Sequence, residues 1–475
     1  MIEPDKFVRW QIDHLQAEVA VAGARSPASA NPLAERIYRS SWFRFVTQHL
    51  QNFYWTVTRL VGLGYLHDGS LHKPREAKWH EPAPLPVKLL APVQFAPLQR
   101  PRILFDVTLS AHHGATGIAR VIREYAKGGA ETGCGVPMIV SKSLDLTPAY
   151  PQQMPGRKLT IETGDILFLF DWMGNDPATF IRLMEAAVRK GAHVVLGLHD
   201  ILPFMYPGLF PADTGPALRT LVDRGVSLAD GIVTVSGSAA EDIRAYIVEA
   251  GLPYRPGLGI GWNHLGADFQ DGEPAGGVDP KLAGVFQSAP VFLMVGTVEP
   301  RKGHRTALAA FDRLWRDGAE VRYLIVGGMY WNARSIGEEI RTHPEFGRRL
   351  FWFDEASDAD VAYAYRHATS LIFASLSEGF GLPLVEAAKF GLPIIASDIA
   401  VFREIAGDAA SYFEALDVDS LAARLRESLA GKRIPPLFPV RTWHESAQDL
   451  FALLRSENYQ LALPPHVSSP ASLAS

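Results

Sequence analysis

The chain has 475 residues, too many for one hydrophobic core, so we expect two domains of ordinary size with extensions. Hydrophobic residues make up 47% and charged residues 20% of it, which excludes bulk disorder, and the net charge of -5 argues against a nucleic-acid binder. The single cysteine, Cys134, excludes an internal disulfide and a multi-cysteine metal site.

Residues 1–100 form a predicted N-terminal extension. The start MIEPDKFVRW lacks a secretion signal, and no uncharged apolar run reaches the roughly 18 residues of a spanning helix, so we expect a cytoplasmic protein. Apolar residues at steps of three and four predict one amphipathic helix, flanked by arginines: Phe43, Val46, Leu50, Phe53, Val57 and Leu60. Two interpretations stay open, a peripheral contact with the inner face of an anionic cytoplasmic membrane, or packing within the protein or a dimer. The segment EPAPLPVKLLAPVQFAPLQRP is typical of an extended tether.

Short apolar runs that alternate with helical stretches predict two doubly wound α/β domains. The first spans 101–272, with the buried strands ILFDVT, DILFLF, HVVLGLHD and GIVTVS. The loop QDGEPAGGVDP marks a boundary, and the pattern restarts over 285–440 with VFLMVG, VRYLIVGG, LFWF, SLIFAS and PIIAS. A C-terminal helix is expected over 441–456, and the polar tail over 457–475 should be disordered.

The segment SLSEGFGLPLVEAAKFGLPIIAS predicts an anion site. A strand runs into a glycine-bearing loop and a helix begins near Leu384, so backbone N–H groups point into the space beyond the strand. Seven residues separate Glu378 in the loop from Glu386 in the helix. A loop carboxylate can accept hydrogen bonds from sugar hydroxyls, and one on the first helical turns can take both hydroxyls of a ribose. The alternative is that Gly379 and Gly381 only make a tight turn and the glutamates are solvated.

The segment VFLMVGTVEPRKGHRTALAAF places two basic residues at the end of a strand. The strand ends at Val295 and a helix begins near His304, so Arg301 and Lys302 lie opposite the region that should hold phosphate. A guanidinium fork and a compact ammonium suit the neutralisation of a diphosphate leaving group. A solvated basic turn is the alternative.

These motifs lead to a family. EGFGLPLVE followed by GLPIIASD and preceded by GTVEPRKGH resembles retaining glycosyltransferase family 4, particularly bacterial mannosyl- and rhamnosyltransferases of surface polysaccharide synthesis, over residues 102 to 456. The resemblance implies a GT-B fold, in which two Rossmann-like domains face each other across a cleft and the helix over 441–456 returns to the first. It implies that Arg301 and Lys302 hold the diphosphate, Glu378 the donor sugar and Glu386 the ribose. The rest of the implied donor set is Gly296, Thr297, Gly379, Phe380, Gly381 and Leu382.

The first domain carries further echoes of this family. In DVTLSAHHGATGIARV, Gly114 and Gly117 match the glycine loop that faces the donor phosphates. HDILPFMYP matches the acceptor-side strand end, which would place His199 and Asp200 near the sugar and the acceptor. Ser236 and Ser238, in TVSGSAAEDI, are expected to cap a helix or to line the cleft.

No metal or cofactor is expected. The motifs DAD at 358–360 and DVD at 417–419 precede apolar-periodic helices, where aspartate is a favoured cap. His112 and His113 have no third ligand at a suitable spacing.

The resemblance therefore implies transfer of a hexose with retention, in which the departing phosphate oxygen takes the acceptor proton and His199 or Asp200 orients the reactants. GDP-mannose is the first-choice donor, ahead of UDP-glucose and dTDP-rhamnose, and the acceptor is a glycan or a polyprenyl-diphosphate-linked oligosaccharide. Two alternatives are a GT-B sugar-nucleotide epimerase and an inactive sugar-nucleotide-binding scaffold. The oligomeric state is left open.

Overall fold

The computed structural model describes residues 6, 9–11, 13, 14, 17, 93–108, 117–155, 158–170, 176–211, 213–268 and 277–464. The predicted amphipathic helix, from Phe43 to Leu60, lies outside them. The chain divides into two compact units. The amino-terminal unit comprises Trp79–Met205, Asp213–Ala267 and Arg441–Ser475, and the carboxyl-terminal unit comprises Met1–Lys78, Tyr206–Ala212 and Asp268–Val440.

The amino-terminal unit is built on an eight-stranded sheet of order β14-β7-β6-β5-β4-β1-β2-β3. The strands from β7 to β2 in this order pair in parallel, and the edge strands β14 and β3 are antiparallel. Continuous apolar runs such as ILFD and ILFL are buried along their whole length, as strands covered on both faces require. The strands are β1 (Ile103–Asp106), β2 (Gly135–Val140), β3 (Leu146–Pro148), β4 (Ile166–Leu169), β5 (His193–Gly197), β6 (Gly231–Thr234), β7 (Gly259–Trp262) and β14 (Leu461–Ala462).

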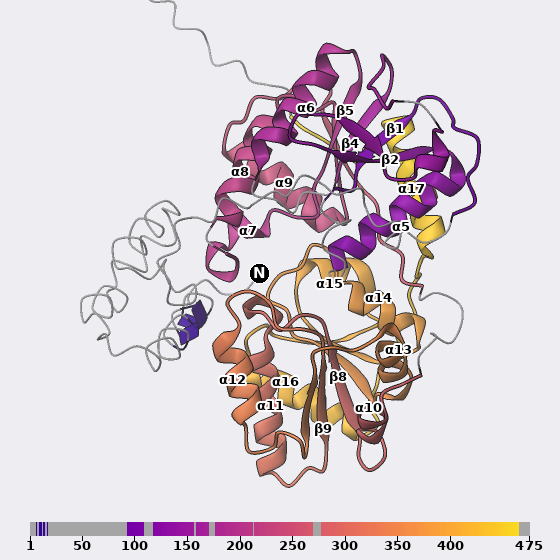
Figure 1. Cartoon of the computed structure of the whole chain (residues 1–475). Coiled ribbons are helices and arrows are strands. Elements are labelled where there is room, and N and C mark those ends of the chain that lie inside the picture. The colour runs from indigo at the N-terminus through magenta and orange to yellow at the C-terminus, as the bar shows by residue number, and fades with distance from the viewer. Residues whose placement is uncertain are drawn as a thin grey trace, which may run out of the picture. The chain divides into compact units, whose positions relative to one another are not determined.

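Helices cover both faces of this sheet (Figure 1). On one face α5 (Gly117–Thr132) packs against α17 (Trp443–Ser456), and on the other lie α6 (Pro177–Arg189), α8 (Thr214–Gly225) and α9 (Gly237–Glu249). Two shorter helices of this unit follow β3 and β5, η3 (Pro151–Gln153) and α7 (Leu202–Met205), while the next one, η4 (Pro207–Leu209), belongs to the carboxyl-terminal unit. A buried polar network joins the first pair of helices to the end of β7, because Asn263 Nδ2 donates to Tyr125 Oη at 2.9 Å and to Ser446 O at 2.9 Å.

The carboxyl-terminal unit has a six-stranded sheet of order β10-β9-β8-β11-β12-β13, parallel throughout. The centre of this order is the point at which the chain reverses its direction of winding, where doubly wound folds bind ligands beyond the carboxyl ends of the strands. The strands are β8 (Val291–Val295), β9 (Arg322–Val326), β10 (Leu350–Phe353), β11 (Ser370–Phe373), β12 (Ile394–Ser397) and β13 (Ser411–Phe413).

Two apolar clusters fill the two faces of this sheet. Helices α11 (His304–Arg316), α12 (Arg334–Thr342) and α16 (Val418–Leu429) cover one face, and α10 (Pro280–Gly284), α13 (Asp358–His367), α14 (Leu382–Lys389) and α15 (Ala400–Ala406) cover the other. The turn η5 (Pro300–Lys302) lies between β8 and α11.

Helix caps account for the two aspartate motifs. Ser357 and Asp360 form a capping box at the start of α13, with Asp360 N donating to Ser357 Oγ at 3.2 Å and Ser357 N donating to Asp360 Oδ2 at 2.9 Å. Asp417 caps α16 by accepting from Ser420 N at 2.9 Å. Both motifs therefore begin helices, as the sequence predicts.

Two short segments from earlier in the chain belong to the carboxyl-terminal unit. Trp331 Nε1 donates to Leu209 O at 3.1 Å, which fixes the segment after α7. His14 is 3% exposed, and its Nδ1 lies 2.6 Å from Arg305 Nη1 on α11. No helix among the described residues is long and apolar enough to span a bilayer.

Candidate functional site

The loops that follow β8 and β11 meet at the carboxyl edge of the six-stranded sheet. Leu376 N donates to Arg301 O at 2.8 Å, so the two loops share a backbone hydrogen bond. Gly303 has φ +75°, and a Cβ atom there would lie 2.1 Å from Ala374 O. Only glycine lets the loops approach this closely, which explains why a glycine stands between the basic pair and α11.

Arg301, Lys302 and Glu378 form a charge cluster at this meeting point. Glu378 Oε1 accepts from Lys302 Nζ at 2.6 Å and from Ser375 Oγ at 2.7 Å, and Glu378 Oε2 accepts from Arg301 Nη1. Arg301 Nη2 also lies 2.8 Å from Glu299 Oε1. The structure thus brings together the three residues to which the sequence assigned the diphosphate and the sugar.

The cluster is buried, so its charges are poorly screened. The side chain of Glu378 is 7% exposed, that of Lys302 10% and that of Arg301 17%. Burial by itself favours the neutral form of Glu378, but the charges of Arg301 and Lys302 and the hydrogen bonds to its carboxylate hold its pKa at about 2. Burial lowers the pKa of Lys302 and the charge of Arg301 lowers it further, while the neighbouring carboxylates oppose both effects.

Arg301 and Lys302 are therefore held in position by carboxylates of the protein itself. The sequence predicts Arg301 and Lys302 opposite a phosphate, and the structure shows both paired with carboxylates. A dianionic diphosphate that arrives beside them would exchange with Glu378 as their partner. Glu378 would then be released toward other hydrogen-bond donors, such as sugar hydroxyls.

The glycine loop turns sharply into α14. Gly381 has φ +106° and precedes the helix, which begins at Leu382, two residues before the predicted start near Leu384. Pro383, in the first turn, favours this earlier start because its φ is already helical. Phe380 is 4% exposed, so its side chain anchors the loop in the core and leaves only its backbone for contact with a donor. Gly379 lies in the same buried loop.

Glu386 lies inside α14 and is 5% exposed. Its Oε2 accepts from Tyr365 Oη on α13 at 2.8 Å. The structure therefore gives this carboxylate an internal partner that the sequence did not predict.

Gly296 and Thr297 continue β8 toward β9. Gly296 N donates to Val326 O at 2.9 Å, and Gly296 has φ +136°. The ring of His304 lies with Nε2 3.3 Å from Thr297 O and is 2% exposed. Burial lowers the pKa of His304 to about 4, so the imidazole is neutral near pH 7 and can donate to that carbonyl.

The remaining predicted residues belong to the amino-terminal unit. The ring of His199 lies 4.2 Å from that of Phe170, and its Nε2 is buried without a hydrogen-bond partner in the part of the chain that the structure describes. Burial lowers its pKa to about 4, against the effect of a hydrogen bond with the Phe170 backbone. Asp200 Oδ1 accepts from the backbone N–H of Leu202, the first residue of α7, at 3.0 Å.

Three other predictions concern the starts of helices in this unit. Ser236 caps α9, as predicted, by accepting from Ala239 N at 3.1 Å. Gly117 is the exposed first residue of α5, while Gly114 lies outside the described residues.

Sequence reasoning missed Glu299, Ser375 and Tyr365. Glu299 stands between Val298 and Pro300, and nothing in this sequence context indicates a role. In the structure it is 1% exposed and its carboxylate pairs with the charge of Arg301. Ser375 lies two residues after the end of β11, where its hydroxyl reaches the carboxylate of Glu378. Tyr365 occupies an apolar position of α13, and its burial, with the hydroxyl needing a partner, is the signal that could have pointed to Glu386.

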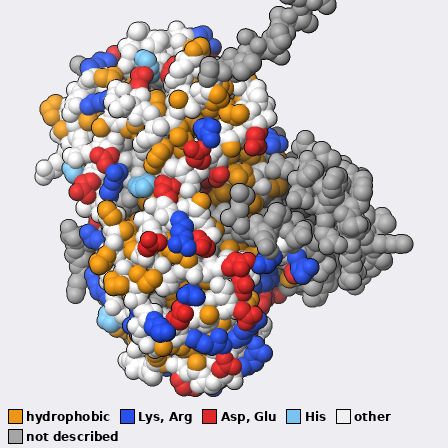
Figure 2. Space-filling view, turned by 180° about the vertical axis from the view of Figure 1, so that it is seen from behind, with side chains coloured by type: hydrophobic (Ala, Val, Ile, Leu, Met, Phe, Trp, Pro, Cys, Tyr) orange, Lys and Arg blue, Asp and Glu red, His pale blue; other side chains and the backbone are white. Residues whose placement is uncertain are grey.

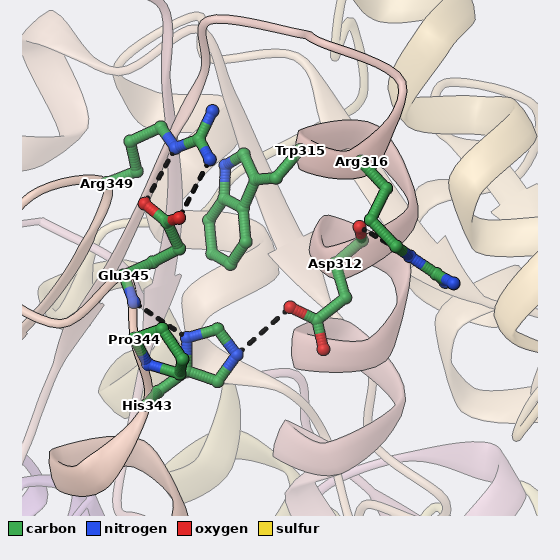
Figure 3. Close-up of a pocket in the computed structure, with 7 residues that line it drawn as sticks. All are labelled: Asp312, Trp315, Arg316, His343, Pro344, Glu345 and Arg349. Carbon is green, nitrogen blue, oxygen red and sulfur yellow. Dashed lines mark hydrogen bonds and ion pairs between the residues drawn. The ribbon is translucent and has the colours of Figure 1, made fainter.

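A hollow of the carboxyl-terminal unit lies away from this site. It measures about 570 Å³ and is lined by Asp312, Trp315, Arg316, His343, Pro344, Glu345 and Arg349 (Figure 3). The end of α11 and the loop before β10 form it, so it lies at the amino edge of the sheet. Its charged groups satisfy each other: Glu345 accepts from Arg349 Nε and Nη2 at 2.8 Å each, and His343 Nε2 lies 3.0 Å from Asp312 Oδ1.

On the face in view in Figure 2, basic and acidic side chains of the described residues are interspersed, without the single-sign surface that a nucleic-acid binder gathers. Within the described ranges, no group of three or more His, Cys, Asp or Glu side chains is placed to hold a metal ion.

Comparison with protein families matches residues 281–436 to the family described as glycosyl transferases group 1. This span contains the charge cluster, the glycine loop and α14.

Curated proteins with similar sequences include mannosyltransferases. The serotype-specific mannosyltransferase WbdA of Escherichia coli is 35% identical over 353 residues, which cover 69% of this chain and 41% of that protein. The O-antigen chain mannosyltransferase B of Escherichia coli is 28% identical over 241 residues, which cover 50% of this chain and 61% of that protein. The chain thus spans less than half the length of WbdA.

Among solved structures, sucrose-phosphate synthase from Thermosynechococcus elongatus is similar, with a TM-score of 0.52 and 16% identity over 75% of this chain and 97% of that one. At this identity the likeness concerns the fold alone. It confirms the predicted fold class, two Rossmann-like α/β domains of the GT-B type.

Proposed function

We propose that this chain, which carries a glycosyl transferases group 1 domain over residues 281–436, moves mannose from GDP-mannose to a hydroxyl of a glycan or a polyprenyl-diphosphate-linked oligosaccharide in bacterial surface polysaccharide synthesis. The observation that carries the proposal is the buried cluster of Arg301, Lys302 and Glu378 beside the glycine loop. The choice of mannose is supported by the two relatives named as mannosyltransferases.

The cluster supplies what departure of a nucleoside diphosphate requires. Negative charge grows on the diphosphate as the bond to the anomeric carbon breaks, so cations fixed beside it stabilise the transition state more than the ground state. Arg301 and Lys302 are held in place before the donor arrives, which reduces the reorganisation that the reaction requires. The N-terminus of α14 adds backbone N–H groups at the same edge of the sheet.

Glu378 has a second task in this scheme. When the diphosphate replaces it as the partner of the two cations, its carboxylate accepts hydrogen bonds from the hydroxyls of the donor sugar. Its low pKa keeps it an acceptor across the physiological range.

Transfer proceeds with retention and without a metal in this proposal. The bond between the anomeric carbon and the leaving oxygen breaks with its electron pair on the diphosphate, the acceptor oxygen bonds to the same carbon on the same face, and the acceptor proton passes to the departing phosphate oxygen. The products are the mannosyl acceptor and GDP. His199, neutral at pH 7, orients a reactant by hydrogen bonding, and Asp200 fixes the turn that carries it.

The reaction takes place in the cytoplasm, at the inner face of the membrane, if the arginine-flanked stripe around Phe43 to Leu60 binds anionic lipid. A lipid-linked acceptor would then be presented to the enzyme at that surface.

A panel of sugar nucleotides tests the choice of donor. A ligand at 100 times its Kd stabilises a protein by roughly 2.7 kcal/mol, which is readily seen as a rise in Tm. We expect GDP-mannose to raise Tm more than UDP-glucose or dTDP-rhamnose, and Glu386→Gln to reduce the rise. A larger rise with another nucleotide would contradict the donor assignment, and no rise with any sugar nucleotide would contradict the proposed class.

A further inference from the structure

Tyr365 and Glu386 form a buried pair between neighbouring helices of the carboxyl-terminal unit. Tyr365, on α13, is 1% exposed and Glu386, on α14, is 5% exposed. The tyrosine Oη donates to the glutamate Oε2 at 2.8 Å. Since a phenol has a single proton to donate, Tyr365 commits its donor to this carboxylate.

The ring of Tyr365 is also fixed by α14. It stacks on Phe390 with 5.5 Å between the ring centroids and 7° between the planes. Phe390 follows Glu386 by four residues and is the C-cap residue at the end of α14. Tyr365 therefore contacts α14 at two points, and its hydroxyl cannot swing away without loss of the ring contact.

Such a bond constrains the carboxylate. A glutamate has three rotatable side-chain bonds, and burial of its charge without hydrogen bonds is costly. Donation to Oε2 favours one orientation of the carboxylate plane and so sets the position of both oxygens. A carboxylate offers about four acceptor sites, so the bond from Tyr365 does not by itself saturate Glu386.

We propose that Tyr365 is a positioning residue for recognition of the donor ribose: it orients Glu386 so that this carboxylate accepts from the vicinal ribose hydroxyls. The inference rests on the proposed function, in which the donor is a nucleoside diphosphate sugar and Glu386 binds the ribose. Tyr365 contacts no part of the donor in this proposal. It acts through Glu386, and its removal weakens the ribose contact selectively.

The selective readout is the preference for GDP over 2′-deoxy-GDP, measured by isothermal titration calorimetry with the full chain. The wild type should bind GDP about tenfold or more tightly than 2′-deoxy-GDP, since a hydrogen bond to a charged group is lost with the hydroxyl. In Tyr365→Phe, this preference should fall to within about threefold. In Glu386→Gln, adding Tyr365→Phe should change the preference little, because both substitutions disturb one contact.

Tyr323→Phe is the matched control. Tyr323 is a fully buried tyrosine of β9 in the same unit, and its hydroxyl lies 3.0 Å from Met294 Sδ instead of a carboxylate. Loss of this hydroxyl should leave the ribose preference unchanged, whatever it does to Tm.

If Tyr365→Phe keeps the wild-type preference for GDP, the inference is overturned. Equal loss of affinity for both nucleotides together with a lower Tm would also overturn it, because that result indicates a merely structural role. A wild type that binds GDP-mannose but does not distinguish the two nucleotides would also overturn it and leave the proposed function standing. A wild type that binds neither GDP-mannose nor GDP would overturn the proposed function as well.

Discussion

Replacement of Lys302 by methionine removes one cation from the cluster and preserves most of the volume of its stem. Lys302 is 8% exposed and its Nζ lies 2.6 Å from Glu378 Oε1. In Lys302→Met, Arg301 and Ser375 still donate to Glu378. The carboxylate is therefore not left without partners, and the variant should fold.

The expected effects on stability and on turnover differ in size. Loss of one of several hydrogen bonds to the carboxylate should lower the free energy of unfolding by about 1–2 kcal/mol, less than the roughly 3–5 kcal/mol for breaking a buried pair outright. Loss of a preorganised group beside the leaving diphosphate should raise the activation barrier by about 3–4 kcal/mol, which lowers kcat about 10²- to 10³-fold. Water cannot substitute for the ammonium in so buried a position.

The assay is GDP release under single-turnover and steady-state conditions, with donor affinity measured separately by calorimetry. Donor affinity should fall by less than about tenfold, since the charge on the diphosphate peaks in the transition state. Lys389→Met is the matched control, because Lys389 is an exposed lysine on α14 of the same unit. It should keep the wild-type kcat.

Turnover of Lys302→Met within about threefold of the wild type would refute the assignment of leaving-group stabilisation to Lys302. Parallel losses of donor affinity and of kcat/KM, with kcat unchanged, would show that the lysine binds the donor without favouring the transition state.

Further expectations concern metal, membrane, pH and backbone. Transfer should survive dialysis against EDTA, because Asp360 and Asp417 cap helices; loss with rescue by manganese would reverse this. Serine at Phe43, Phe53 and Leu60 of the predicted amphipathic helix should abolish co-sedimentation with anionic liposomes and spare transfer to a soluble acceptor. If the full-length protein does not bind liposomes, the proposed membrane contact is wrong. Burial depresses the pKa of His304 to about 4, so the stability that this residue contributes is complete above about pH 6.5. It is lost as the pH falls toward 4, by up to about 1.4 kcal/mol per pH unit. In urea unfolding, the free energy of unfolding of His304→Asn should therefore depend less steeply on pH than that of the wild type, and an unchanged slope would contradict the assignment. Gly303→Ala should destabilise the protein by well over about 1 kcal/mol, because its Cβ would meet Ala374 O. Gly318→Ala is the control: Gly318 has a similar φ of +82° but lies in open space, so its substitution should cost about 1 kcal/mol. Equal losses of Tm in the two variants would count against the close approach of the two loops.

The sequence predicts well the strands and the loops that follow them, because the signals for both are local. The residues of the strands that end at Val295 and Phe373 are apolar enough to be buried on both faces of the sheet. The glycines that follow these strands mark the turns at the edge of the sheet. The end of β8 at Val295 and the start of α11 at His304 are both as predicted. The start of α14 was predicted two residues late, because Pro383 was not read as a first-turn residue.

Partner choice could not be predicted, because it depends on contacts between distant parts of the chain. Arg301 and Glu378 are 77 residues apart in sequence, and each motif considered alone suggests a group ready for a ligand. The structure shows that they hold each other. The link from Tyr365 to Glu386 is similarly non-local, and in the sequence Tyr365 is one more apolar position on a helix.

The central claim is mannosyl transfer from GDP-mannose, and mass spectrometry of a defined acceptor tests it most directly. The full chain is incubated with GDP-mannose and a mannose-terminated, polyprenyl-diphosphate-linked oligosaccharide, and acceptor mass and GDP are measured together. Each acceptor should gain one hexose for each GDP released, and Lys302→Met should slow both events equally. Conversion of GDP-mannose into another sugar nucleotide without change in the acceptor, or complete survival of the donor, would contradict it.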